Sequence, residues 1–268
     1  MPRAPKPTLL LGAGLLGLSL VLACGEPPQL SGQVLDIWGK PIEGATVAVE
    51  GIFEQAHTDV GGAFKMVAPL VQARVMAGKD GYIPEALQAP TLNEDQDDPE
   101  PLAFHLYPEP EHPGFYAVGR EAYQELEGFR ARTMGTEVRA FTGVPDIGES
   151  TVSQDQVLTF VFTTTLRRER LAQLDLKLHR LEFIDESRLP GVLGDTNASV
   201  ELWTAVGEPI PYDLVGLASR DDFLIKLREK LPRGVYAFHT QDVLTDHSYE
   251  ALDKLPKELR MAYVFELR

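Results

Sequence analysis

The sequence contains very little cysteine, since Cys24 is the only one among 268 residues. A single thiol cannot form an intrachain disulfide or a cysteine-based zinc site, so the fold depends on packing and hydrogen bonds. Signatures of common enzymes are also missing. The six histidines form no H-x-H or H-x-x-x-H pair, and no G-x-S-x-G nucleophile elbow is present. We therefore predict a protein that is not an enzyme, with no catalytic residue, no metal site and no other cofactor.

Positive charge is scarce as well. The chain has 25 lysines and arginines against 40 aspartates and glutamates, which gives a formal net charge of −15. An acidic surface repels the phosphates of nucleic acids and the head groups of anionic lipids, while it favours solubility and cation binding. We therefore expect no nucleic-acid partner.

Only one long apolar run occurs, LLLGAGLLGLSLVLA at residues 9–23. Its 15 residues fall short of the roughly 20 that a membrane-spanning helix needs. Arg3 and Lys6 precede the run, and small residues lead into Cys24, an arrangement typical of a secretory signal peptide. Residues 1–23 are therefore predicted to be a signal peptide, and an uncleaved membrane anchor is the alternative.

The end of this run, Val21-Leu22-Ala23-Cys24, resembles the lipobox of bacterial lipoproteins. The resemblance implies that the Cys24 thiol receives a diacylglyceryl group, that the chain is cut before it, and that its new amine is acylated. Two or three acyl chains anchor a protein stably, whereas a single chain binds only marginally. The resemblance thus predicts lipidation at Cys24 and a lipid-anchored protein of the cell envelope. Because Gly25 is not an aspartate, the outer membrane is favoured.

The same run contains a match to a nucleotide-binding motif. Residues 12–17, GAGLLG, fit G-x-G-x-x-G, and Asp36 follows about 20 residues later. The expected helix would have no polar face, residues 25–28 (GEPP) would interrupt the unit, and no alternation of strands and helices follows. The match is therefore assigned to the signal peptide and not to a dinucleotide site.

Removal of residues 1–23 leaves 245 residues, and the loss of Arg3 and Lys6 changes the formal net charge from −15 to −17. We predict a tether at 24–29, a first domain at 30–107, a stiff proline-rich linker at 108–113 and a second domain at 114–268. Both domains are expected to be β-sandwiches, so the predicted fold is mostly β with minor helix.

The first domain alternates apolar and polar residues in short segments separated by turns. Strands are predicted at 33–35, 45–49 and 63–67, with turns at 36–41 and 59–62. This spacing closely resembles the carboxypeptidase regulatory-like domain, a transthyretin-like β-sandwich. The matching positions are Gly32, Val34, Asp36, Gly39, Pro41, Ile42, Gly44, Ala45, Val47, Val49, Gly51, Thr58, Asp59, Gly62, Phe64, Gly81 and Tyr82.

The resemblance implies a module without catalytic residues. In bacterial surface proteins such a domain is a spacer or an adhesion-like module, and related sandwiches sometimes bind sugars. Asp36, Thr58 and Asp59 are accordingly interpreted as turn and cap residues in preference to ligands. The pattern departs from the family at residues 67–70, where a glycine-bearing turn is usual.

A dense acidic run, NEDQDDPEP, spans residues 93–101. Carboxylate oxygens are the ligands that Ca²⁺ prefers, so a calcium loop is one interpretation. The run lacks the central glycine and the distal glutamate of an EF-hand loop, which favours a solvated loop between strands.

The second domain is again rich in β patterns. Strands are predicted at 157–163, 174–178, 181–184, 199–205, 223–227, 235–239 and 262–267, and short helices at 120–129 and 248–254. The alternation changes phase near Arg180, which predicts a β-bulge or bend there. Residues 231–236 (LPRGVY) are typical of a tyrosine corner, in which Tyr236 bonds the upstream backbone. A second, immunoglobulin-like sandwich is therefore expected.

Few candidate site residues remain. His239 and His247 lie eight positions apart with two aspartates between them, which suits a metal site or, equally, an exposed loop. Trp38 and Trp203 are candidates for a carbohydrate-binding surface, or else core residues. We predict a non-enzymatic, lipid-anchored envelope protein that is structural or binds an envelope protein or a glycan. A carbohydrate- or Ca²⁺-binding module is the alternative, and a hydrolase whose site the sequence does not reveal is a third hypothesis.

Overall fold

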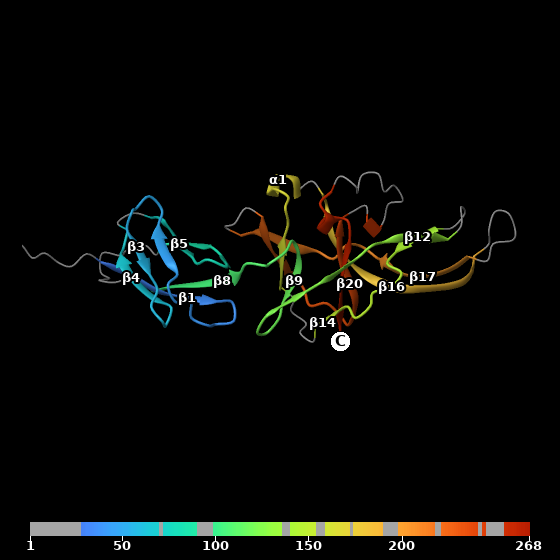
Figure 1. The fold of residues 1–268 in the computed structure, drawn as a ribbon, viewed down its shortest axis with the longest axis horizontal. Coiled ribbons are helices and arrows are strands. Elements are labelled where there is room, and N and C mark those ends of the chain that lie inside the picture. The colour runs from blue at the N-terminus through green and yellow to red at the C-terminus, as the bar shows by residue number, and fades with distance from the viewer. Residues whose placement is uncertain are drawn as a thin grey trace, which may run out of the picture.

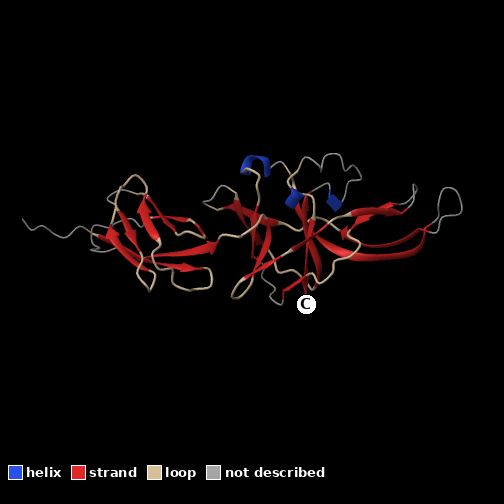
Figure 2. Ribbon diagram, in the orientation of Figure 1, coloured by secondary structure: helices blue, strands red, loops and turns tan. Residues whose placement is uncertain are grey.

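The computed structural model describes residues 28–69, 72–89, 99–135, 140–153, 159–171, 174–189, 198–217, 221–240, 243–244 and 255–268. Strands dominate these residues, and the helical segments are short, as in α1 (Arg168–Leu171) and the 3-10 helix η2 (Lys257–Leu259) (Figure 2). The predicted mostly β fold with minor helix is confirmed. The predicted signal peptide and Cys24 lie outside the described residues. Within the described ranges, no helix is long and apolar enough to cross a bilayer.

Two four-stranded sheets form the N-terminal sandwich (Figure 1). The first sheet has the order β4 (Ala63–Val67), β1 (Gln29–Asp36), β8 (Leu102–Pro108), β6 (Tyr82–Ile83), and the second has the order β3 (Gln55–His57), β2 (Thr46–Val49), β5 (Arg74–Gly78), β7 (Glu85–Gln88). β1 pairs with β8 in parallel and with β4 antiparallel. Alternate residues of β2 and β4 are buried, as the period of two requires. The buried core between the sheets includes Val34, Phe64 and Phe104 from one sheet and Val47 and Val75 from the other.

The turns of this sandwich are held by the side chains that the sequence analysis interpreted as turn and cap residues. Asp36 Oδ1 accepts hydrogen bonds from the N–H groups of Trp38 and Lys40, at 2.9 and 2.8 Å. Thr58 Oγ1 donates a hydrogen bond to the carbonyl of Ile42 and accepts one from the N–H of Ala45. Asp59 Oδ1 closes the next turn as Asp36 does, by accepting from the N–H groups two and four residues later. Gly62 has φ +74°, and a Cβ there would lie 2.4 Å from the carbonyl oxygen of Val34. Only glycine therefore fits this turn.

The C-terminal sandwich is larger. Its first sheet has the order β10 (Tyr123–Glu125), β9 (Gly114–Val118), β15 (Thr159–Thr163), β19 (Asp222–Leu227), β18 (Tyr212–Gly216). Its second sheet has the order β11 (Glu127–Phe129), β21 (Ala262–Leu267), β20 (Gly234–Thr240), β16 (Leu176–Leu189), β17 (Ala198–Val206). The short strand β14 (Thr151–Ser153) also pairs with β21. A short hairpin of β12 (Arg132–Gly135) and β13 (Ala140–Gly143) lies against β17. The core between the sheets is rich in phenylalanine. Phe115 stacks on Phe162 and Phe238 with ring centroids 4.2 and 5.1 Å apart.

The predicted bulge at Arg180 is wrong. Arg180 pairs in register with Val206 on one side and Tyr236 on the other, and the irregularity in β16 lies between Glu186 and Leu189. The alternation of apolar and polar residues changes phase because both faces of the sheet are covered. Leu178 packs into the core between the sheets, whereas Leu181 packs into a second cluster on the opposite face.

The helix predicted at 120–129 is also wrong. These residues form β10 and β11, and the chain passes from one sheet to the other at Leu126, which is buried. Three apolar residues here have a helical spacing, but Leu126 packs between the two sheets, Phe129 packs into the cluster on the outer face of the second sheet, and Ala122 is exposed. The helix predicted at 248–254 lies outside the described residues.

The tyrosine corner is confirmed. The hydroxyl of Tyr236 donates a hydrogen bond of 2.6 Å to the carbonyl of Pro232, four residues upstream. The ring of Tyr236 stacks on Phe265 in the core, with centroids 5.5 Å apart. The Tyr236 hydroxyl thus holds the segment that precedes β20, while the Tyr236 ring packs in the core.

Replacing Tyr236 with phenylalanine removes this hydrogen bond and keeps the ring. We expect the free energy of unfolding to fall by about 1 kcal/mol, as for a typical protein hydrogen bond. The midpoint of urea denaturation measures the loss. Tyr107→Phe is the matched control, because the hydroxyl of Tyr107 has no hydrogen-bond partner in the described part of the chain. Equal destabilisation of the two variants would contradict a role specific to the corner.

The two sandwiches share no strand among the described residues, but they touch directly. The indole N–H of Trp38 donates a hydrogen bond of 2.9 Å to the carbonyl of Gly119, and its ring meets that of Tyr123 edge-on, with centroids 5.5 Å apart. The Tyr123 hydroxyl donates to the carbonyl of Pro108 at 2.9 Å. Ile83 of the first sandwich is buried in one apolar cluster with Tyr116, Val161 and Leu224 of the second. The sandwiches therefore lie end to end with a packed junction (Figure 1).

Candidate binding surfaces

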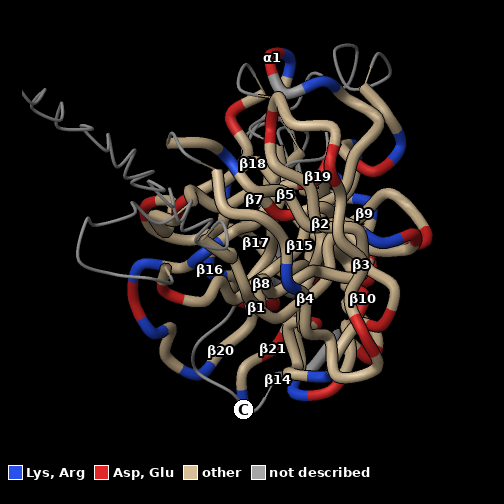
Figure 3. The backbone as a smooth tube through the Cα atoms, turned by 90° about the vertical axis from the view of Figure 1, so that its left-hand side faces the viewer, with Lys and Arg blue, Asp and Glu red and all other residues tan. Residues whose placement is uncertain are grey.

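Several residues proposed from the sequence lie outside the described residues. These are Cys24, residues 93–98 of the acidic run and His247, while residues 99–101 of that run are described. Lipidation and calcium binding at these positions therefore stay predictions. Seen along the long axis, acidic and basic residues are interspersed over the described chain (Figure 3).

The structure assigns the two tryptophans different roles. Trp38 is part of the junction described above, where its N–H is already hydrogen-bonded and its ring is packed. Trp203 lies on β17, partly buried, and its backbone forms a bridge with Val144 through hydrogen bonds of 2.8 and 2.9 Å. Of the two candidates for a ligand surface, Trp203 alone fits this role.

His239 forms a buried pair, but with His179. The two side chains project from neighbouring strands β16 and β20 and are 5% (His179) and 1% (His239) exposed. His179 Nδ1 lies 2.8 Å from His239 Nε2, and His239 Nδ1 lies 2.7 Å from the carbonyl oxygen of Thr240. The carbonyl accepts from Nδ1–H of His239, so Nε2 of that ring accepts from Nδ1–H of His179. One neutral tautomer of each ring satisfies every one of these contacts.

Burial keeps this pair uncharged. It lowers the pKa of His239 to about 4, against the smaller opposing effect of the hydrogen bond to Thr240. Burial, followed by the nearby ammonium of Lys177, also lowers the pKa of His179. No group of three or more ligands suitable for a metal ion occurs among the residues that the structure describes. Because both rings are buried and hydrogen-bonded, the pair is a packed structural element of the outer sheet face. The alternation of residues 174–179 predicts which face of the strand carries His179, but it does not predict that His239 of the neighbouring strand lies beside it.

An exposed aromatic side chain lies beside Trp203. Phe183 of β16 is paired directly with Trp203 of β17, and the two rings are 5.4 Å apart at an angle of 52°. Phe183 is 48% exposed although it lies in the interior of a long strand. The Trp203 ring is anchored by the apolar cluster on that face of the sheet, which includes Val144 and Val264. The two rings thus form a fixed apolar surface open to solvent, called here the aromatic platform.

Two carboxylates flank the aromatic platform. Asp185 follows Phe183 by two residues and Glu201 precedes Trp203 by two, so all four side chains lie on one face of the hairpin. Asp185 and Glu201 are exposed and directly opposite one another in the register. Like charges facing each other across strands are unfavourable for stability, so packing alone does not account for them. They place hydrogen-bond acceptors next to the rings.

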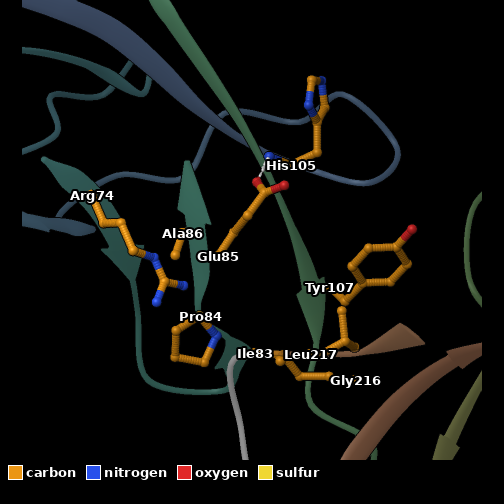
Figure 4. Close-up of a pocket in the computed structure, with 9 residues that line it drawn as sticks. All are labelled: Arg74, Ile83, Pro84, Glu85, Ala86, His105, Tyr107, Gly216 and Leu217. Atoms are coloured by element: carbon orange, nitrogen blue, oxygen red, sulfur yellow. Dashed lines mark hydrogen bonds between the residues drawn. The ribbon is translucent and has the colours of Figure 1, made fainter. Parts of the chain in front are cut away.

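A pocket of about 420 Å³ opens at the junction of the sandwiches (Figure 4). Arg74, Pro84, Glu85 and Tyr107 come from the first sandwich, and Leu217 comes from the second. The Glu85 carboxylate accepts a hydrogen bond of 2.7 Å from the N–H of His105 on β8. Burial and the proximity of Glu85 raise the pKa of Tyr107. The pocket is part of the junction, since its lining comes from both sandwiches. Its acidic side chain, Glu85, is already hydrogen-bonded to the backbone of β8.

Comparisons with known proteins give distant likenesses. No family model and no curated protein matches this chain. A presumed carbohydrate-binding protein from Bacteroides uniformis has 11% identity and a TM-score of 0.25, over 91% of this chain and 100% of the other. A mutant type II cohesin–X-dockerin complex from Acetivibrio cellulolyticus has 18% identity and a TM-score of 0.25, over 30% of this chain. The match spans 58% of that cohesin–dockerin chain.

Proposed function

We propose that this protein is a non-enzymatic, lipid-anchored envelope protein that binds a neutral glycan on the aromatic platform. The observation that carries the proposal is the solvent-exposed Phe183 held against Trp203. The C–H groups of a pyranose ring pack well on such aromatic surfaces, and its hydroxyls donate to carboxylates such as Asp185 and Glu201. The formal net charge of −15 disfavours anionic glycans as ligands. An envelope protein is the alternative partner.

The arrangement of the chain suits this function. Cys24 precedes the first described residue, Pro28, by four residues, a length of at most about 14 Å. A lipid on Cys24 would therefore hold the N-terminal sandwich close to the bilayer. The hairpin of β16 and β17, which carries the aromatic platform, extends from the far end of the molecule (Figure 1). The platform would thus lie far from the membrane.

Replacing Phe183 with alanine is expected to weaken glycan binding by about fivefold to 150-fold, because a stacking aromatic surface contributes roughly 1–3 kcal/mol. A neutral-glycan array identifies the ligand, and calorimetry measures the affinity of the variant. Phe53→Ala is the matched control, because Phe53 is fully exposed on the first sandwich, away from the platform. The proposal would be wrong if no array glycan bound the wild type, or if both variants lost affinity equally.

A further inference from the structure

A second cavity, independent of the aromatic platform, lies at a corner of the C-terminal sandwich. It has a volume of about 590 Å³ and opens where the chain passes from β10 to β11. One wall comes from the crossing segment and the other from the residues around η2 and the start of β21. Its polar lining comprises His112, Glu125, Glu127, Lys257, Glu258 and Tyr263.

Glu258 is a buried acid held in one orientation. It is only 8% exposed, and its Oε1 accepts three hydrogen bonds. These come from the hydroxyl of Thr164 at 3.0 Å, and from the N–H and hydroxyl of Thr165 at 3.1 Å each. Among the described residues, no donor is bound to the second oxygen, Oε2. Glu258 therefore brings a fixed carboxylate with spare acceptor capacity to the cavity wall.

Tyr263 supplies a buried hydroxyl without a partner. The residue is 5% exposed, and its ring packs on Phe115 with centroids 4.6 Å apart. Its hydroxyl makes no hydrogen bond to any residue that the structure describes. Burial, together with the charges of Glu258 and Glu125, raises the pKa of Tyr263, so the hydroxyl stays protonated. A buried polar group normally has a hydrogen-bond partner, and one supplied by a ligand would satisfy it.

The charge and shape of the cavity define what would fit. In the lining, the carboxylates of Glu127 and Glu258 outnumber the single ammonium of Lys257, so a cation is favoured. No group of three metal ligands is close enough together in the described part of the chain, which disfavours a metal ion. Leu126 and Met261 add apolar surface. A Cβ on Gly128 would lie 2.9 Å from Met261 Cε and 3.1 Å from a ring carbon of Tyr263, so glycine lets these two side chains pack closely against this wall.

We propose that this cavity binds a primary ammonium group carried on a short aliphatic chain. The carboxylate of Glu258 accepts from the ammonium, the Tyr263 hydroxyl accepts another of its N–H donors, and Leu126 and Met261 contact the aliphatic chain. A free alkyl amine and a lysine side chain of a partner share this chemistry. The inference does not depend on glycan binding at the aromatic platform.

Calorimetry on the full mature chain tests the proposal with three probes. Butylammonium represents a free amine, Nα-acetyl-lysine amide represents a lysine side chain, and butan-1-ol is the neutral control. We expect at least one amine to bind and the alcohol not to bind at equal concentration. Binding of butylammonium alone would indicate a free amine as the source, and binding of the lysine amide would indicate a peptide. Absence of amine binding, or equal binding of the alcohol, would overturn the proposal.

Two variants locate the binding. Glu258→Gln keeps the oxygen that accepts from Thr164 and Thr165 but removes the charge, and should weaken amine binding at least tenfold. Tyr263→Phe should weaken it severalfold. Glu182→Gln, which changes an exposed glutamate on β16, is the matched control and should bind like the wild type. Circular dichroism confirms the fold of each variant. Unchanged affinity in Glu258→Gln would also overturn the proposal.

Discussion

Replacing Cys24 with serine is expected to abolish lipid attachment and to move the protein from the membrane fraction to the soluble fraction. The thiol is the predicted acyl acceptor, and no other cysteine is present to replace it. Without acyl chains the mature chain loses the apolar contact that anchors it, whereas two or three chains give stable anchoring. Metabolic labelling with a palmitate analogue and fractionation of envelopes measure the two effects.

The fold should not change in this variant. The described residues begin at Pro28, and the buried cores of the two sandwiches are built from side chains between Leu30 and Leu267. Circular dichroism of Cys24→Ser should therefore match that of the wild type. Ser19→Ala, within the same apolar run, is the control that keeps the cysteine and should be labelled normally. Undiminished labelling of Cys24→Ser would show that the predicted lipid attachment is wrong.

Lowering the pH from 7 to 4 is expected to cost about 3 kcal/mol of stability through His239 alone. The imidazole has a pKa of about 6.5 in the unfolded chain, and burial lowers it to about 4 in the fold. The unfolded chain therefore binds the proton more tightly between these values. The stabilisation is complete above about pH 6.5, and each unit below costs about 1.4 kcal/mol until about pH 4. The lowered pKa of His179 acts in the same direction.

Urea denaturation at a series of pH values measures this dependence. Carboxylates also titrate near pH 4, so the informative quantity is the difference between the wild type and a variant. His239→Asn retains a donor to the Thr240 carbonyl but cannot titrate, and should lose the extra dependence between pH 6.5 and 4. His105→Asn changes an exposed histidine and should keep it. An identical pH dependence in His239→Asn and the wild type would show that the buried pair does not control acid stability.

Much of the secondary structure follows from local pattern. The turns closed by Asp36 and Asp59 need a short acceptor side chain and a glycine, and both requirements are visible in the sequence. The strands β15, β20 and β21 are rich in aromatic and β-branched residues and lie within or close to the predicted segments. The tyrosine corner depends on residues only four positions apart, so Tyr236 could be assigned from the motif.

Errors arose where one segment is buried against two surfaces. Residues 120–129 look helical because Leu126 packs between the two sheets while Phe129, three residues later, packs against the outer face of the second sheet. The phase change after Arg180 suggested a bulge, but Leu178 and Leu181 simply pack into clusters on opposite faces. Alternation of apolar and polar residues identifies a strand that is buried on one face, but it does not describe a strand that is buried on both faces.

The sequence by itself determined the predicted anchor at Cys24, the β-rich composition and the turn chemistry, because these depend on neighbouring residues. Only the tertiary structure decided which side chains meet across long separations. It buried His239 against His179, 60 residues away, and fixed Trp38 at the junction through a carbonyl 81 residues away. It left Trp203 beside an exposed Phe183. Such pairings follow from the order and register of strands, which local patterns do not specify.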